Sequence, residues 1–323
     1  MWLELIAILG GFALLAWSAD RFVQGASAIA VNLSIPPLII GLTIVSIGTS
    51  APEIIVSAVA AWQGNSGLAV GNALGSNIIN TGLILGFTAL IIPLNVHSSI
   101  IRRELPVLMV VMAVALLLLI DGRLDRIDGI VLLTGMALML SWITWLGIRA
   151  QGTAEPMAHE FAEEMPVNTP MRNAVTLLVV GAVVLFASSR LLVWGAVSVA
   201  HTMGVSDLLI GLTVVALGTS LPELAATVIS ALRNEHDIAI GNVVGSNIFN
   251  LLAVLGLPGL IHPITIDPSV LTRDYPAMAG LTVLLFVMAY GFTGPGRLNR
   301  LEGALLLLAF GAYQVLLYFT ELH

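Results

Sequence analysis

The sequence predicts an all-α polytopic membrane protein with ten transmembrane helices, arranged as two inverted repeats of five helices. The first observation is composition: 58% of the 323 residues are hydrophobic and only 10% are charged, whereas a soluble domain carries about 25% charged residues. The second is length, because ten spans of about 20 residues leave only short loops. The third is an internal duplication. A net charge of −7 and the absence of cysteine exclude a nucleic-acid-binding surface, disulfides and thiolate sites.

Ten apolar segments are the expected spans, and their approximate boundaries are 2–19, 35–61, 70–92, 105–120, 129–148, 173–190, 206–231, 241–262, 276–293 and 300–320. The first segment begins Met-Trp-Leu-Glu without a basic region, so it is predicted to be a transmembrane helix and not a cleaved signal peptide. The longest polar stretch, 150–172, is acidic and rich in proline. It is predicted to be a cytoplasmic linker between a first repeat at 1–149 and a second repeat at 173–323.

The two halves are copies of each other, mostly displaced by 170 residues. The matching pairs are GLTIVSIGTSAPEIIVSAVAA (41–61) with GLTVVALGTSLPELAATVISA (211–231), GNALGSNIINTGLILG (71–86) with GNVVGSNIFNLLAVLG (241–256), and Glu104-Leu-Pro106 with Asp274-Tyr-Pro276. Only one further pair, GRLDRIDG (122–129) and GRLNRLEG (296–303), has a different spacing, of 174 residues. A register kept across several helix ends indicates a tandem repeat. Because each repeat has five spans, the second enters the membrane from the opposite side, so the halves are inverted.

The basic residues, all twelve of them Arg, predict the orientation. If the N-terminus is external, the inward loops hold eight Arg residues and the outward loops hold four. Basic residues concentrate in cytoplasmic loops. We therefore expect a multi-pass protein of the plasma (inner) membrane with both termini outside.

Two carboxylates, Glu53 and Glu223, lie inside otherwise uncharged apolar spans, where a charge costs about 2.5–3.5 kcal/mol on insertion scales. No Arg or His occurs within 35–92 or 206–232, so the compensating cation must be a proton or a metal ion. Hydroxyl and amide side chains recur near each Glu at helical spacing. They are Thr43, Ser46, Thr49, Ser50, Ser57, Asn72, Ser76, Asn77 and Asn80, then Thr213, Thr219, Ser220, Thr227, Asn242, Ser246, Asn247 and Asn250. Such oxygens suit hard cations, including Na⁺ and Ca²⁺.

Pro52 and Pro222 predict broken helices beside these carboxylates. Proline has no N–H, so the carbonyls of Gly48 and Gly218 lose their helical partners. Half-helix ends with a negative dipole would then point at a cation.

Glu104 and Asp274, each two residues before a proline, are predicted to mark helix starts. A further set is expected to serve close helix packing: Gly71, Gly75, Gly82 and Gly86.

The duplicated motifs resemble the two α-repeats of the calcium:cation antiporter superfamily: GTSAPE (48–53) with GSNIIN (75–80), and GTSLPE (218–223) with GSNIFN (245–250). The whole chain is similar to its sodium/calcium exchanger-like bacterial inner-membrane members of the YrbG type. The resemblance implies α-repeats at about 35–92 and 205–262 and a first and sixth helix that slide across the ion core. It also implies these ion ligands: Ser46 and Ala216 through backbone carbonyls, with Thr49, Ser50, Glu53, Ser76, Asn80, Thr219, Ser220, Glu223, Ser246 and Asn250.

Together these features predict a secondary antiporter that exchanges Ca²⁺ for Na⁺ by alternating access, without a cofactor. A Ca²⁺/H⁺ antiporter is the first alternative, because two buried carboxyls can carry protons. A non-transporting cation-binding membrane sensor is the second. An enzyme is not expected, since the spans lack a nucleophile with a base and a His/carboxylate metal set. Some family members carry Asp where Asn250 stands, so the coupling ion and stoichiometry stay open, as do the oligomeric state and the choice among Ca²⁺, Mn²⁺ and Mg²⁺.

Overall fold

A computed structural model describes residues 2–35, 37–64, 66–96, 101–150, 169–202, 216–290 and 296–321. Within these ranges the chain is mostly helical, as predicted. Seven helices are long and apolar enough to cross a membrane, or eight if the bent pair Gly41–Thr49 and Ala51–Trp62 forms one span. Ten spans and the inverted arrangement therefore stay predictions. Part of the expected seventh span and most of the expected linker lie outside the described residues.

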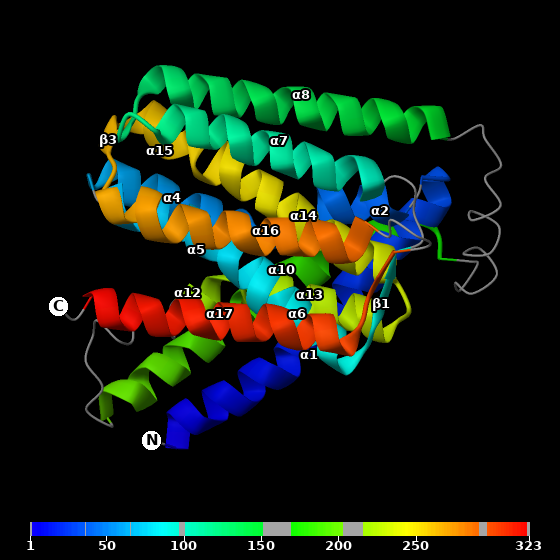
Figure 1. The fold of residues 1–323 in the computed structure, drawn as a ribbon. Coiled ribbons are helices and arrows are strands. Elements are labelled where there is room, and N and C mark those ends of the chain that lie inside the picture. Colours follow the sequence, from blue (N-terminus) through cyan, green and yellow to red (C-terminus); the bar gives the residue numbers. More distant parts are fainter. Residues whose placement is uncertain are drawn as a thin grey trace. The chain divides into compact units, whose positions relative to one another are not determined.

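The first half contains α1 (Trp2–Leu33), α2 (Pro37–Ile40), the π-helical segment η1 (Gly41–Val45), α3 (Ser46–Thr49), α4 (Ala51–Trp62), α5 (Ser66–Ile78), η2 (Ile79–Leu85), α6 (Gly86–Ile91), β1 (Leu94–Val96), α7 (Ile101–Leu119), β2 (Arg123–Leu124) and α8 (Arg126–Ala150) (Figure 1). The second contains α10 (Met171–Thr202), α12 (Ala216–Thr219), α13 (Leu221–Leu232), α14 (His236–Phe249), η4 (Asn250–Val254), α15 (Gly256–Ile261), β3 (Ile264–Thr265), η5 (Val270–Asp274), α16 (Tyr275–Tyr290), β4 (Gly296–Leu298) and α17 (Arg300–Glu321).

Two compact units make up the chain, and each takes segments from both halves of the sequence. Unit 1 comprises Met1–Pro52 and Leu140–Asn242, and unit 2 comprises Glu53–Met139 and Val243–His323. The division falls between Pro52 and Glu53 but leaves Pro222 and Glu223 together. Glu53 therefore belongs to unit 2, whereas Glu223 belongs to unit 1. The division into repeats at 1–149 and 173–323 is a statement about sequence and stays a prediction.

In unit 1, α1 and α10 pack along each other (Figure 1). A Cβ on Gly25 would lie 2.8 Å from the carbonyl oxygen of Ala174, and a Cβ on Gly181 would lie 2.6 Å from the amide nitrogen of Phe22. Both helices have 32 residues, longer than the expected spans 2–19 and 173–190. The polar residues that ended the predicted first span do not end the helix, because no proline precedes Pro36.

In unit 2, α16 packs against α7 and α5, and α17 packs along α6 and η2. Two antiparallel strand pairs, β1 with β4 and β2 with β3, join helix ends from the two halves of the sequence.

The prediction that four glycines serve close helix packing holds only in part. A Cβ on Gly82 would lie 2.8 Å from the Cβ of Phe310, and one on Gly86 would lie 3.0 Å from the carbonyl oxygen of Gly303, whereas Gly71 and Gly75 have nothing within 4 Å.

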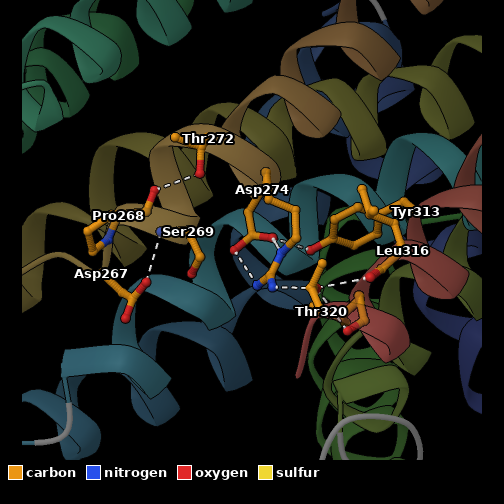
Figure 2. A network of polar contacts seen from close by, with 10 residues as sticks. Asp267, Pro268, Ser269, Thr272, Asp274, Tyr313, Leu316 and Thr320 are labelled. Atoms are coloured by element: carbon orange, nitrogen blue, oxygen red, sulfur yellow. Dashed lines mark hydrogen bonds and ion pairs between the residues drawn. The ribbon is translucent and has the colours of Figure 1, made fainter. Parts of the chain in front are cut away.

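A polar network joins the start of α16 to α17 in unit 2 (Figure 2). The Arg273 guanidinium donates to both carboxylate oxygens of Asp274, at 2.7 and 3.2 Å, and to the hydroxyl of Thr320 at 2.8 Å. The Tyr313 hydroxyl donates to the same carboxylate at 2.9 Å. Just before η5, hydrogen bonds from Ser269 to the carboxylate of Asp267 lower the pKa of that exposed side chain.

Candidate ion-binding site

Both proline-containing helices are broken where the sequence predicts. The first breaks at Ser50, between α3 and α4, with a bend of 51° between Gly41–Thr49 and Ala51–Trp62. The second breaks at Ser220, between α12 and α13, and Pro222 stands in the first two positions of α13. A proline is tolerated in a first helical turn because its missing N–H has no partner there anyway. Each Glu therefore begins a half-helix.

The carbonyl of Gly218 is released from its helix, as predicted, but it does not stay without a donor. It accepts a hydrogen bond of 2.9 Å from the hydroxyl of Ser189 on α10. Both glycines also pack against apolar side chains, since a Cβ on Gly48 would lie 3.0 Å from the Phe22 ring of α1 and a Cβ on Gly218 would overlap Val193 of α10. The residue of α1 that matches Ser189 is Ala19. The contact between α10 and the second broken helix thus contains a hydrogen bond in addition to apolar packing.

In unit 1, Glu223 contacts a residue of the first repeat. The Ser50 hydroxyl donates to Oε1 of Glu223 at 3.0 Å. The Glu223 side chain is only 1% exposed. Its second oxygen, Oε2, is buried and has no hydrogen-bond partner among the described residues. A buried carboxylate oxygen without a donor is costly, so this atom is suited to bind a cation.

Asn242 organises the same part of unit 1. Its Nδ2 donates to the Thr227 hydroxyl at 3.0 Å and lies 3.4 Å from the Glu223 carbonyl oxygen. Its Oδ1 accepts from the Thr49 hydroxyl at 3.1 Å, and its carbonyl accepts from the Ser46 hydroxyl at 3.1 Å. One asparagine of the second repeat therefore holds expected ligands from both repeats.

Unit 2 contains the matching arrangement around Glu53. The Nδ2 of Asn72 donates to the Glu53 carbonyl oxygen at 3.0 Å and to the Ser57 hydroxyl at 2.9 Å. The sequence placed Asn72 and Asn242 on polar helix faces without giving them a role. The sequence feature that could have revealed this role is their spacing, since each Asn stands 19 residues after the Glu of its own repeat. Duplicated residues thus form duplicated hydrogen bonds that orient the start of each half-helix.

The two GSN motifs meet within unit 2, where α5 packs against η4. The Nδ2 of Asn77 donates to the Asn247 carbonyl oxygen at 3.2 Å, and the Nδ2 of Asn247 donates to the Thr81 hydroxyl at 2.8 Å. These bonds join the helix that carries Ser76 and Asn80 to the helix that carries Ser246 and Asn250.

Two of the expected amide ligands lie on π-helical segments. Asn80 is in η2 and Asn250 begins η4, and π-helical turns are frequent at functional sites. Within the described ranges, neither polar atom of the Asn80 side chain has a hydrogen-bond partner, and the same holds for Oδ1 of Asn250, although all are buried. The Oδ1 atoms therefore remain available for a cation.

One expected ligand and two hydroxyls of the predicted polar stripes are less well defined. Ala216 begins α12, where only its backbone is described, and Thr213 lies outside the described residues. Thr43 donates to the Ile39 carbonyl oxygen of its own helix at 2.6 Å, which is the ordinary structural use of such a hydroxyl. No group of three or more His, Asp or Glu residues that could hold a metal occurs in the described part of the chain. A cation would need the hydroxyl and amide oxygens as well.

The family model described as sodium/calcium exchanger protein matches residues 3–145 and 173–319 of this chain. The chain belongs to the sodium/calcium exchanger family. The resemblance predicted from the duplicated motifs is thereby confirmed. Members of this family are transporters, so the chain is a multi-pass membrane transporter and not an enzyme. The unmatched gap contains the polar stretch predicted to be a linker.

Individual relatives agree with this family assignment. Putative antiporter CaxA of Alkalimonas amylolytica is 51% identical over 313 residues, which cover 97% of this chain and 98% of that protein. Inner membrane protein YrbG of Escherichia coli strain K12 is 44% identical over 292 residues, which cover 90% of each chain. A structure of the sodium-calcium exchanger NCX_Mj, soaked with 2.5 mM Na⁺ and 0.1 mM Ca²⁺, has a TM-score of 0.82 at 31% identity, over 97% of this chain and 98% of that chain.

Proposed function

We propose that this exchanger-family protein is a secondary antiporter that exchanges Ca²⁺ for Na⁺ at one site shared by Glu53 and Glu223. The observation that carries the proposal is the bond from Ser50 to Glu223, because it joins the two motifs and leaves the second carboxylate oxygen without a donor. The proposed ligands are those of the resemblance: Ser46, Thr49, Ser50, Glu53, Ser76, Asn80, Ala216, Thr219, Ser220, Glu223, Ser246 and Asn250.

Charge balance explains how such a site would make exchange obligatory. Two carboxylates balance one Ca²⁺, and Na⁺ ions competing for the same oxygens also neutralise them. An empty pair of charges is too costly to carry across the bilayer interior. Loaded states would therefore interconvert between inward-facing and outward-facing forms, while the empty state would not.

Na⁺ is proposed as the coupling ion because the ligands around each Glu are mainly hydroxyls and amides, which offer oxygens to a hard cation. The alternative coupling ion is H⁺, since the same two carboxyls can bind protons. The relative NCX_Mj was studied with Na⁺ and Ca²⁺, which supports the first choice. We also propose that both termini lie outside the cell and that α1 and α10 move across the ion-binding helices.

The test is ⁴⁵Ca²⁺ uptake into proteoliposomes of purified protein under an imposed Na⁺ gradient or an imposed pH gradient. Uptake driven by Na⁺ is the expected result. Uptake driven only by the pH gradient would reassign the coupling ion to H⁺. Ca²⁺ binding without uptake under either gradient would contradict transport and favour a sensor.

Variants of the two carboxylates test whether one shared site is responsible. Glu53→Gln and Glu223→Gln are each expected to abolish Na⁺-driven uptake and to weaken Ca²⁺ binding, because one remaining carboxylate cannot balance a divalent ion. Asp267→Asn is the matched control, since it removes a carboxylate that is exposed and lies before η5. Normal Na⁺-driven uptake in either Glu variant would overturn the shared site.

A further inference from the structure

Glu104 is a buried carboxyl outside the proposed ion site. It lies in the first turn of α7, and its side chain is only 1% exposed. Neither carboxylate oxygen has a hydrogen-bond partner anywhere in the described part of the chain. Its position fits the prediction that it marks a helix start, but it accepts no hydrogen bond from the backbone. A helix-start signal alone therefore does not account for this residue.

The repeat supplies a direct comparison, because Glu104 matches Asp274 and Arg103 matches Arg273 at the spacing of 170. Asp274 is fully paired: Arg273 binds both of its oxygens, and the Tyr313 hydroxyl donates to one of them (Figure 2). Arg103 is exposed, while Glu104 beside it is buried. The same acidic position is thus paired in one repeat and unpaired in the other.

The difference between the two repeats can be traced to single residues. The two hydroxyls of α17 that complete the network around Arg273 and Asp274 belong to Tyr313 and Thr320. At the spacing of 174 that relates α17 to α8, their counterparts are Met139 and Leu146. Methionine and leucine cannot donate a hydrogen bond. The first repeat therefore lacks the two hydroxyls that complete this network in the second.

Three elements packed against α7 offer no substitute in their described residues. They are α16, η4 and β2. Among their described residues, η4 has no titratable group, and the Tyr275 hydroxyl at the start of α16 already donates to the carbonyl oxygen of Met112. Arg123 of β2 follows the opposite end of α7. On α7 itself the charged neighbours of Glu104 are Arg102 and Arg103.

We propose that Glu104 is a proton-binding site, distinct from the ion ligands, which holds a proton in this conformation and releases it to water when its surroundings open. An ionised carboxylate buried without donors costs several kcal/mol, whereas the neutral acid needs far less compensation. The proton is taken from water and returned to water, so no other reactant is required. A ligand that binds one conformation better shifts the population toward it, and here that ligand is the proton.

Contact between α7 and η4 connects this site to the exchanger. The first residue of η4 is Asn250, a proposed ion ligand, so a conformational preference set at Glu104 would reach the ion site through one helix contact. This second step rests on the proposed function, whereas proton binding by Glu104 does not. The two parts therefore need separate measurements.

Infrared spectroscopy of the reconstituted protein tests proton binding directly. The spectra are recorded in saturating Ca²⁺ between about pH 5 and about pH 9. The wild-type protein is expected to show the infrared band of a protonated carboxyl group. Glu104→Gln and Glu104→Ala are both expected to lack this band. Asp274→Asn is the matched control and is expected to keep the band, because Asp274 is already paired with Arg273. An unchanged band in both Glu104 variants would overturn the proposal, whether or not the protein exchanges Ca²⁺.

The pH profile of Ca²⁺ uptake tests the connection to exchange. Glutamine resembles a protonated glutamate, so wild type and Glu104→Gln are expected to have the same rate at low pH and to differ at least about threefold at high pH. Asp274→Asn serves again as the control and is expected to change the rate without changing the shape of the profile. If the uptake rates of wild type and Glu104→Gln change with pH in the same way, the proposed effect of Glu104 on exchange is contradicted. Proton binding by Glu104 is then judged by the infrared measurement alone.

Discussion

Asn72 and Asn242 orient buried carboxylates through the backbone. Each donates from its amide to the Glu carbonyl oxygen and to a hydroxyl one turn further along the half-helix. These bonds fix the first turn from which the carboxylate projects while leaving its oxygens for other partners. A ligand held in place before the cation arrives loses less entropy on binding.

Asn242→Ala is expected to weaken Ca²⁺ binding about thirtyfold. The variant removes bonds to Thr227 and Thr49 that are each worth about 1 kcal/mol, and a total loss of about 2 kcal/mol corresponds to a factor of about thirty. Half-saturation of ⁴⁵Ca²⁺ uptake measures the effect. Asn32→Ala is the control, because that amide bonds only to the carbonyls of Ala28 and Thr169 on an exposed surface. Equal effects of the two variants would contradict the positioning role.

At the scale of single residues, the sequence identifies oxygen donors more readily than their partners. The spacing of Ser46, Thr49 and Ser50 around Pro52 placed them on one polar stripe, and all three side chains are buried. The bond between Thr49 and Asn242 joins residues 193 positions apart. No local spacing predicts such a pair, because it exists only after the two repeats have packed.

Among the elements, the pair α1 and α10 is held by backbone contact at glycine. We expect Gly25→Ala to destabilise the protein by about 1–3 kcal/mol, because the added carbon would overlap backbone atoms of α10 that cannot rotate away. Gly10→Ala in the same helix meets nothing within 4 Å and is expected to be neutral or slightly stabilising. Thermal unfolding in detergent measures both variants, and a harmless Gly25→Ala would contradict the close contact.

The hydroxyl of Ser189 gives a second prediction for this pair. Ser189→Ala leaves the Gly218 carbonyl without its donor and is expected to cost about 1 kcal/mol of stability. The adjacent Ser188→Ala is the matched control, since that hydroxyl bonds only to the Leu185 carbonyl of its own helix. Thermal unfolding should distinguish the two, and identical melting temperatures would show that the bond to the broken helix is dispensable.

Helix breaks are predictable from sequence, but the π-helical segments are not. Pro52 and Pro222 carry a local reason for a break, namely a missing N–H. In η4 the amide of Leu255 bonds five residues back to Asn250 at 2.9 Å. Nothing in the residue types of η4 requires this wider turn, since the same apolar run fits an α-helix. The choice depends on packing against other elements, so the sequence alone predicted an unbroken helix there.

For the whole molecule, duplication is the feature from which the sequence predicts two related halves. One spacing of 170 residues recurs in segments that lie in both units, so the evidence for two related halves does not depend on any single motif. The sequence does not predict the units themselves. Each unit combines helices from both repeats, and such exchange depends on long-range packing that a repeat alignment cannot show.

Inverted topology predicts opposite exposure for equivalent residues. Trp62 and Leu232 are equivalent at the spacing of 170, end α4 and α13, and are 83% and 56% exposed. Because the chain has no cysteine, Trp62→Cys and Leu232→Cys each create a single thiol. In spheroplasts, a membrane-impermeant maleimide is expected to label Trp62→Cys, but to label Leu232→Cys only after permeabilisation. Labelling of both from the same side would contradict inversion.

The π-helical segment η2 also constrains how the gene can change. A π turn contains one residue more than an α turn, so deletion of one residue from Ile79–Leu85 would let the backbone close into a regular α-helix. Because the wide turn already takes up the extra residue, the helix beyond it would keep Gly86 facing α17, whereas a deletion from a regular α-helix would rotate everything beyond it by about 100°. We therefore expect η2 to accept the loss of one residue during evolution more readily than the regular α-helices on either side of it.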